Sequence, residues 1–106
     1  MPGVAVLGGL NMDLVVETPR PAGPGETREG SRFHETPGGK GGNQAVAAAL
    51  LLGERGPVFL VGRVGPDRYG DELIASLQAA GVDTRYVRRD PARSSGVAVI
   101  LIDAQG

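Results

Sequence analysis

The residues best suited to chemistry lie in the stretch 37–45, which reads Pro-Gly-Gly-Lys-Gly-Gly-Asn-Gln-Ala. Glycines leave the main-chain N–H groups uncovered, so a ligand can approach the backbone closely. The helix that we predict over residues 44–52 begins with N–H donors that have no helical partner and with the positive end of its dipole. The stretch therefore predicts a loop that binds a polar or anionic ligand.

Two nucleotide-binding motifs can be compared with this stretch, and both fail. A phosphate-binding P-loop requires Ser or Thr after its lysine, but Lys40 is followed by Gly41. A dinucleotide fingerprint counted from Gly39 requires glycine where Gln44 stands. The alternative to a binding loop is a glycine-rich turn that only permits close helix packing.

Residue usage across the chain favours the binding loop. Ten of the eleven basic residues are arginine, and the single lysine is Lys40. The two asparagines are Asn43, in the same stretch, and Asn11, which follows the glycine pair Gly8-Gly9. This distribution indicates that these three positions need a compact ammonium group and neutral amides.

Asn11 and Asp13 form a second candidate site directly after a short apolar run, Val4–Leu7. Ligands of open α/β sheets bind at the carboxyl ends of such strands. At a spacing of two, the side chains share one face if the backbone is extended. A carboxylate beside an amide can hold vicinal hydroxyls, because the carboxylate accepts from two O–H groups and the amide both donates and accepts. The alternative is an Asx turn or a helix cap.

Composition excludes several classes of protein. The 106 residues fit one domain at most, with 41% hydrophobic and 22% charged residues. A formal net charge of −1 gives no electrostatic case for a nucleic-acid partner. No apolar run approaches the roughly 20 residues of a membrane span. The chain has no cysteine, which agrees with a cytoplasmic location.

The elements that position these residues follow an α/β order. Apolar runs predict buried strands over 4–7, 57–62 and 97–102, with weaker strand patterns over 14–17 and 86–88. A proline- and glycine-rich excursion over 18–36 predicts an exposed hairpin or lid strand beside the main sheet. Together they predict a right-handed α/β layer with flanking helices.

Two helices connect the strands. The first, 44–52, is rich in alanine and is followed by Gly53 as a C-terminal cap. The second follows Asp67, which we interpret as its N-cap; Asp71 is then a solvated residue rather than its catalytic partner. His34, the only histidine, has no evident triad or metal partner, so we interpret it as a surface residue.

A family resemblance rests on motifs that run through the whole chain. They are Gly-Gly-x-Asn-x-Asp (8–13), Pro-Gly-Glu-Thr (24–27), the glycine-lysine block with its alanine helix (38–49), Val-Gly-x-Asp-x-x-Gly (64–70), Gly-Val-Asp-Thr (81–84) and Ser-Gly-Val-Ala (95–98). In this order they resemble the N-terminal third of the ribokinase-like (PfkB) carbohydrate kinases. The departures are mild: Gly42 stands where the family usually has alanine, Ser95 where threonine is common and Gly9 where serine is common.

The resemblance implies a ribokinase-like fold and ATP-dependent phosphorylation of the 5-hydroxyl of D-ribose. It implies Mg²⁺ and a monovalent cation such as K⁺ as further cofactors. It also implies a small β lid, from strands within about 14–36 and 96–102, through which two subunits form a homodimer. The sugar-binding residues that it implies are Asn11, Met12, Asp13, Gly39, Lys40, Gly41, Gly42, Asn43, Ala98 and Ile100.

The same resemblance places the catalytic base, the ATP pocket and the cation sites beyond Gly106. Residues 1–106 are thus expected to be the N-terminal part of a sugar kinase domain, inactive alone, that contributes no catalytic, cofactor-binding or metal-binding residue. Two alternatives stay open. One is a kinase for another sugar or a nucleoside, and the other is a non-catalytic sugar-binding or dimerising module.

Overall fold

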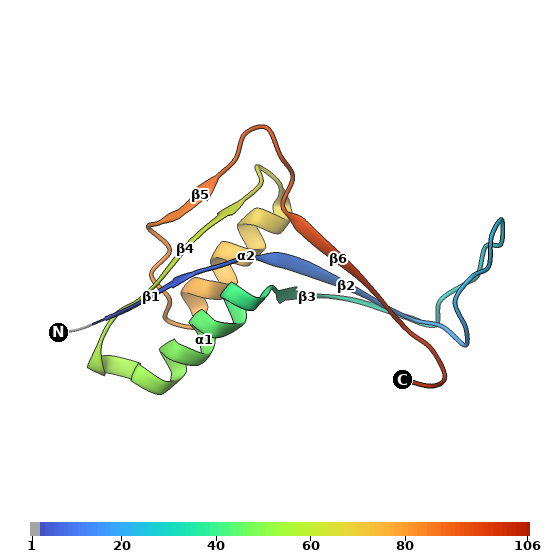
Figure 1. Cartoon of the computed structure of the whole chain (residues 1–106), viewed down its shortest axis with the longest axis horizontal. Coiled ribbons are helices and arrows are strands. Elements are labelled where there is room, and N and C mark those ends of the chain that lie inside the picture. Colours follow the sequence, from blue (N-terminus) through green and yellow to red (C-terminus); the bar gives the residue numbers. More distant parts are fainter. Residues whose placement is uncertain (1–2) are drawn as a thin grey trace.

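The computed structural model describes residues 3–106, an elongated molecule of 55 × 32 × 18 Å (Figure 1). Its elements in chain order are β1 (Val4–Leu7), β2 (Asn11–Glu17), β3 (Arg32–Gly38), α1 (Lys40–Leu52), a 3-10 turn (Gly53–Arg55), β4 (Val58–Val64), α2 (Arg68–Ala79), β5 (Val87–Arg89) and β6 (Gly96–Ile102). This order confirms the predicted sequence of strand, excursion, helix, strand, helix and strand.

The first sheet is parallel, with the strand order β1-β4-β5. Alternate residues of β4 face the helices, because side chains along a strand point to opposite faces of the sheet. Val58, Leu60 and Val64 are therefore buried in one core with Ala45 of α1 and Leu73 of α2. Both helices thus cover the same face of this sheet, and the predicted α/β fold class is confirmed.

The second sheet has the order β3-β2-β6, with β2 antiparallel to β3 and parallel to β6. Figure 1 shows it extending away from the helices towards the loop between β2 and β3, with the C-terminus near the same end. Its near end belongs to the common core, because Leu10 and Met12 are buried there. The excursion is thus a hairpin, as expected, and β2 begins at Asn11 rather than near residue 14.

Helix α1 begins at Lys40, so the prediction of a start at residue 44 was wrong. Its first turn contains Gly41 and Gly42, which have poor helix propensity in isolation. Gly39, at φ 95°, turns the chain out of β3, and the N–H of Gly42 then donates to the Gly9 carbonyl at 3.2 Å. This tertiary contact outweighs local propensity. Gly53 ends the helix with a positive φ, as predicted.

Asp67 caps α2 and also holds the start of β6. Its Oδ1 accepts hydrogen bonds from the Gly70 N–H at 2.8 Å and the Ser95 hydroxyl at 2.7 Å, and its Oδ2 accepts from the Ser95 N–H at 2.8 Å. The Gly65 N–H donates to the Ser95 oxygen at 2.8 Å. The predicted cap is therefore confirmed, and the same carboxylate joins the N-terminus of α2 to the start of β6.

Strand β6 is the most apolar strand in the chain, and it is exposed. We predicted from its sequence that both of its faces would be buried. In this single chain Val99 is 67% exposed, Leu101 53% and Ile100 38%. Successive residues point to opposite faces. Apolar surface is therefore open on both faces of this strand.

We predict that replacing Asp67 with Ala lowers the stability of the protein that carries this chain, because both the helix cap and the anchor of β6 are lost. Loss of a helix cap predicts a decrease in melting temperature of about 2–4 °C or more. Asp67→Ala, Ser95→Ala and the double variant form a thermodynamic cycle in thermal unfolding. Strictly additive effects would show that the hydrogen bond from the Ser95 hydroxyl to Asp67 contributes nothing.

The same contact predicts a pH dependence. The N–H and hydroxyl of Ser95, with the Gly70 N–H, hold the pKa of Asp67 below its ordinary value. A lowered folded-state pKa gives stability that is present above the unfolded-state pKa, near 4, and is lost as the pH falls through the folded-state value. The melting-temperature difference between wild type and Asp67→Ala should therefore shrink as the pH falls below about 4.

Candidate functional site

Asn11 and Asp13 lie on β2, half-buried, with their side chains on one face of the second sheet. The Asn11 amide Nδ2 donates to Asp13 Oδ1 at 2.6 Å. The extended geometry that our prediction required is therefore present, and neither residue forms a helix cap. One carboxylate oxygen is engaged by the amide, so the other carboxylate oxygen and the amide oxygen are left for a ligand.

The strands on either side of β2 leave space around this pair. In register, Asn11 lies between Gly38 of β3 and Gly96 of β6, so it has a glycine on each side. Asp13 lies between Thr36 and Ala98, both of which have small side chains. Cross-strand neighbours in register have their side chains on the same face. The amide and carboxylate therefore lie on an open part of the sheet.

The N-terminus of α1 packs directly on the turn between β1 and β2. A Cβ atom at Gly41 would lie 2.5 Å from the Gly8 carbonyl carbon, and one at Gly39 would lie 2.6 Å from the Gly9 carbonyl oxygen. These distances are too short for any side chain. The glycine block thus permits close helix packing, which we had considered as the alternative to a binding loop. The same packing brings the first turn of α1 beside the start of β2.

Lys40 and Asn43 are exposed residues of this first turn. The main-chain N–H of Asn43 donates to the Gly39 carbonyl at 3.0 Å. Neither side chain has a charged or amide partner among residues 3–106, and α1 has no side-chain cap at Gly39. The positive end of the helix dipole and the Lys40 ammonium together favour a polar or anionic ligand at this end of α1.

Three other predicted site residues differ in placement. Ala98, half-buried, and Ile100 lie on the same face of the second sheet as Asp13, since Ala98 pairs with Asp13 in register and Ile100 with Val15. Met12 is only 1% exposed, and its side chain belongs to the core on the opposite face. Met12 can therefore contribute only its main chain to a ligand site on the Asp13 face.

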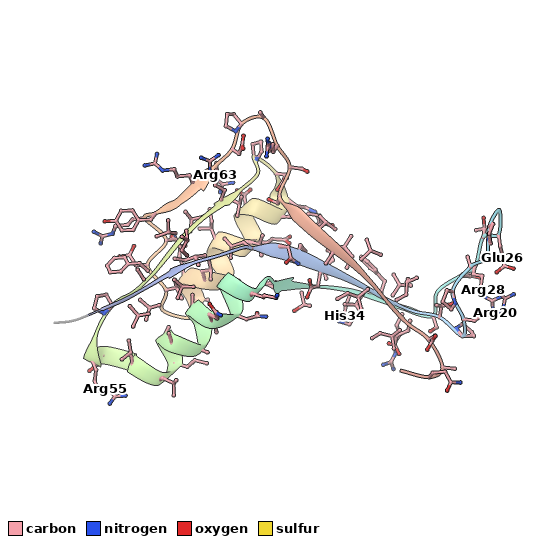
Figure 2. All side chains as sticks on the ribbon, viewed as in Figure 1. Arg20, Glu26, Arg28, His34, Arg55 and Arg63 are labelled. Atoms are coloured by element: carbon pink, nitrogen blue, oxygen red, sulfur yellow. The ribbon has the colours of Figure 1, made fainter. Side chains whose placement is uncertain are left out.

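His34 lies part-way along β3, away from Arg20, Glu26 and Arg28 of the loop between β2 and β3 (Figure 2). It is exposed and pairs in register with Val15, two residues further along the sheet than Asp13. Within residues 3–106 no three His, Asp or Glu side chains gather as a possible metal site. No helix in that range has the length and apolarity that a membrane span needs.

A groove of about 400 Å³ lies between α1, α2 and the end of β3. Its lining is mostly apolar and includes Leu10, Val46, Leu73 and Leu77, with Asn43 as a polar member. Asn11 and Asp13 do not line it. It shares Gly38, Gly42 and Asn43 with the candidate site and so borders the polar face of the second sheet, where the side chains suit a hydroxylated ligand.

Two residues at this site were missed in the sequence. Gly38 was counted as part of the glycine loop, but it pairs with Asn11 in the sheet and lies against the Asp13 carboxylate. Ser95 was noted only as a family motif, but it is buried and anchors the strand that carries Ala98. The sequence of β3, Arg-Phe-His-Glu-Thr-Pro-Gly, has no apolar–polar alternation that could have indicated Gly38. The partner of Ser95 is 28 residues distant and left no local signal.

The fold is that of the ribokinase structures. Ribokinase of Arabidopsis thaliana, solved in complex with ribose and ATP, matches with a TM-score of 0.89 and 34% identity over 99% of this chain and 33% of that one. Ribokinase of Cryptococcus neoformans, solved with ADP, matches with a TM-score of 0.85 and 34% identity over 100% of this chain and 32% of that one. The chain thus has the fold of the N-terminal third of these α/β sugar kinases.

The family follows from the sequence comparison. The model of the pfkB family carbohydrate kinases matches residues 1–106, and the chain belongs to this family. It is 44% identical to a ribokinase of Bacillus subtilis over 96% of its own length and 34% of the relative. It is 42% identical to a deoxyribokinase of Salmonella typhi over 95% and 32%. The chain thus spans about a third of the length of these relatives.

Two adjacent glycines of α1 should respond oppositely to alanine. At Gly41 a Cβ would meet the main chain of Gly8, which cannot move aside, so Gly41→Ala should lose about 1–3 kcal/mol of unfolding free energy. At Gly42 it would meet only the Leu10 Cδ2 atom at 3.0 Å, and alanine gains up to about 1 kcal/mol of helix propensity. Gly42→Ala should be neutral or stabilising.

Urea unfolding of both variants and the wild type measures this difference. The two substitutions are chemically identical and adjacent, so each is the control for the other. Equal losses at the two positions would contradict the close contact between α1 and the Gly8-Gly9 turn.

Proposed function

We propose that the protein containing this chain is an ATP-dependent kinase that transfers phosphate to the 5-hydroxyl of D-ribose, and that these residues form its sugar-binding half. The observation that supports this most is the hydrogen-bonded Asn11–Asp13 pair on an open sheet face, next to the glycine-flanked start of α1. The family and the ribokinase relatives support the reaction class.

Each group has a role in this proposal. The free oxygen of Asp13 accepts hydrogen bonds from sugar hydroxyls, and the Asn11 amide holds the carboxylate in place and offers its own oxygen to a further hydroxyl. Lys40, Asn43 and the main chain of residues 39–42 bind the far side of the sugar. Ala98 and Ile100 cover its apolar surface. These contacts fix the orientation of the 5-hydroxyl for an in-line transfer.

ATP supplies the phosphoryl group when it is bound. Phosphoryl transfer also requires charge neutralisation by Mg²⁺ and a group that orients or deprotonates the attacking hydroxyl. Among residues 3–106 no three His, Asp or Glu side chains gather as a possible Mg²⁺ site, and we assign Asp13 to holding hydroxyls rather than to removing a proton. We propose that the base, the nucleotide site and the K⁺ site lie in the part of the protein that corresponds to the two-thirds of the relatives not covered by this chain. We also propose that the enzyme is cytoplasmic.

Deoxyribose is the second candidate substrate, because the identity to a deoxyribokinase is nearly as high as that to a ribokinase. The Asn11–Asp13 pair suits two neighbouring hydroxyls, which favours ribose. A single lysine at the site argues against a sugar phosphate. Values of kcat/KM for ribose, 2-deoxyribose, fructose, adenosine and fructose 1-phosphate distinguish these substrates.

Asp13→Asn should weaken sugar binding by about 1.5–3 kcal/mol, the range for hydrogen bonds to a charged group, and leave the KM for ATP unchanged. Steady-state kinetics with the preferred sugar measures both constants. Asp71→Asn is the matched control, because Asp71 is an exposed residue of α2 whose surface ion pair contributes little. An unchanged sugar KM in Asp13→Asn would show that Asp13 does not bind the sugar and has only a structural role.

We propose further that the second sheet acts as a lid and forms a homodimer contact. Val97, Val99 and Leu101 lie on one face of β6, and Ile100 and Ile102 on the other, all at least 36% exposed. Apolar strands with an open edge associate unless they are covered. One face covers the sugar and excludes water, which favours transfer to sugar over ATP hydrolysis. The rest of this surface contacts a second copy.

The dimer can be tested with two charge substitutions. Sedimentation of the wild-type protein should give a dimer at micromolar concentration, and Val99→Glu should give a monomer because the charge would be buried in the contact. Leu51→Glu is the control, since Leu51 is equally exposed but lies on α1, away from the second sheet. A monomeric wild type would contradict the proposal.

A further inference from the structure

The Asp13 carboxylate lies directly against Gly38. A Cβ atom built on Gly38 would have three nearest neighbours, and all of them belong to Asp13: Oδ2 at 2.6 Å, Cγ at 2.8 Å and Oδ1 at 2.8 Å. The carboxylate therefore lies over the bare Cα of Gly38. It leans along the sheet from its own cross-strand partner, Thr36, towards the end of β3.

The backbone does not explain why this residue is glycine. Gly39 has φ 95° and needs the freedom of glycine, but Gly38 is not one of the glycines with positive φ. It is the last residue of β3, in register with Asn11, in a conformation that alanine also adopts. What an added methyl group would meet first is a side chain, and that side chain is Asp13.

Two contacts then determine where the carboxylate lies. The Asn11 amide donates a hydrogen bond to Oδ1 at 2.6 Å, and the absence of a side chain at Gly38 leaves room for the other atoms of the carboxylate. Directly after Gly38 come Gly39 and the first turn of α1. The carboxylate is thus directed towards the end of β3 and the N-terminus of α1, rather than out over Thr36 and His34.

We propose that Gly38 is a positioning residue for the sugar site, which holds Asp13 in its hydroxyl-accepting orientation by leaving room for the carboxylate. This inference rests on the proposed function. A methyl group at residue 38 rotates the carboxylate away and breaks its bond to the Asn11 amide. The sugar then loses its charged acceptor, whereas ATP binding is unchanged, because we assign the nucleotide site to the part of the protein that this chain does not cover.

The experiment uses the complete protein in four forms: wild type, Gly38→Ala, Asp13→Ala and the double variant. Gly38→Ala should raise the KM for the preferred sugar about ten- to hundredfold, with the KM for ATP unchanged, as for a lost hydrogen bond to a charged group. In the Asp13→Ala background the same change at Gly38 should have little further effect, because the group that it displaces is absent. Gly23→Ala is the control, since a Cβ there meets nothing within 4 Å.

Melting temperatures of the four forms provide a second test, which holds even if Gly38→Ala folds poorly. A clash with Asp13 predicts that the loss of stability caused by Gly38→Ala is largely relieved by Asp13→Ala. Equal losses in both backgrounds, or an unchanged sugar KM in Gly38→Ala, overturn the inference. A wild type that phosphorylates no sugar overturns the proposed function instead, and the melting-temperature cycle still tells whether Gly38 accommodates Asp13.

Discussion

The rest of this structure depends on one constraint: the main chain of α1 packs directly against the main chain of the turn after β1. Gly8 and Gly41 approach so closely that a Cβ on either would lie within 2.8 Å of the other's backbone. The Gly42 N–H bonds the Gly9 carbonyl across the same contact. Because α1 packs at this distance, its N-terminus lies beside the start of β2. Its polar first turn and the Asn11–Asp13 pair are therefore neighbours.

Two of the contacts that attach the second sheet to the α/β layer lie next to the site. One is the glycine contact at the start of β2. The other is the Asp67 carboxylate, which caps α2 and accepts both the N–H and the hydroxyl of Ser95 immediately before β6. Between these points the near end of the sheet is fixed, and the far end extends freely (Figure 1). The proposed lid is therefore attached at the same end that carries the residues proposed to bind the sugar.

The polar and apolar groups of the second sheet are separated along its length. Asn11 and Asp13 stand at the attached end, between small neighbours. Further along, the same face carries Val15 and Ile100, and the opposite face of β6 carries Val99 and Leu101. The residues that we propose to bind hydroxyls therefore lie at the end of the sheet that packs into the core. The apolar surface lies where another body, a sugar or a second subunit, can cover it.

The sequence by itself determined the local features. Alternation and apolar runs gave the α/β order, Asp67 and Gly53 marked helix ends, and the family motifs identified the pfkB carbohydrate kinases. These signals depend on neighbours within a few residues, so they can be read along the chain. The face shared by Asn11 and Asp13 also followed from spacing, once an extended strand was assumed.

Only the tertiary structure decided the rest. Helix α1 includes Gly41 and Gly42 because the Gly8-Gly9 turn packs against them, a contact that no propensity encodes. The side chain of Met12 is in the core, and Ser95 anchors β6 through a partner 28 residues away. Gly38 accommodates a carboxylate from another strand. In each case the deciding atoms are distant in sequence, and only the folded chain brings them within reach of one another.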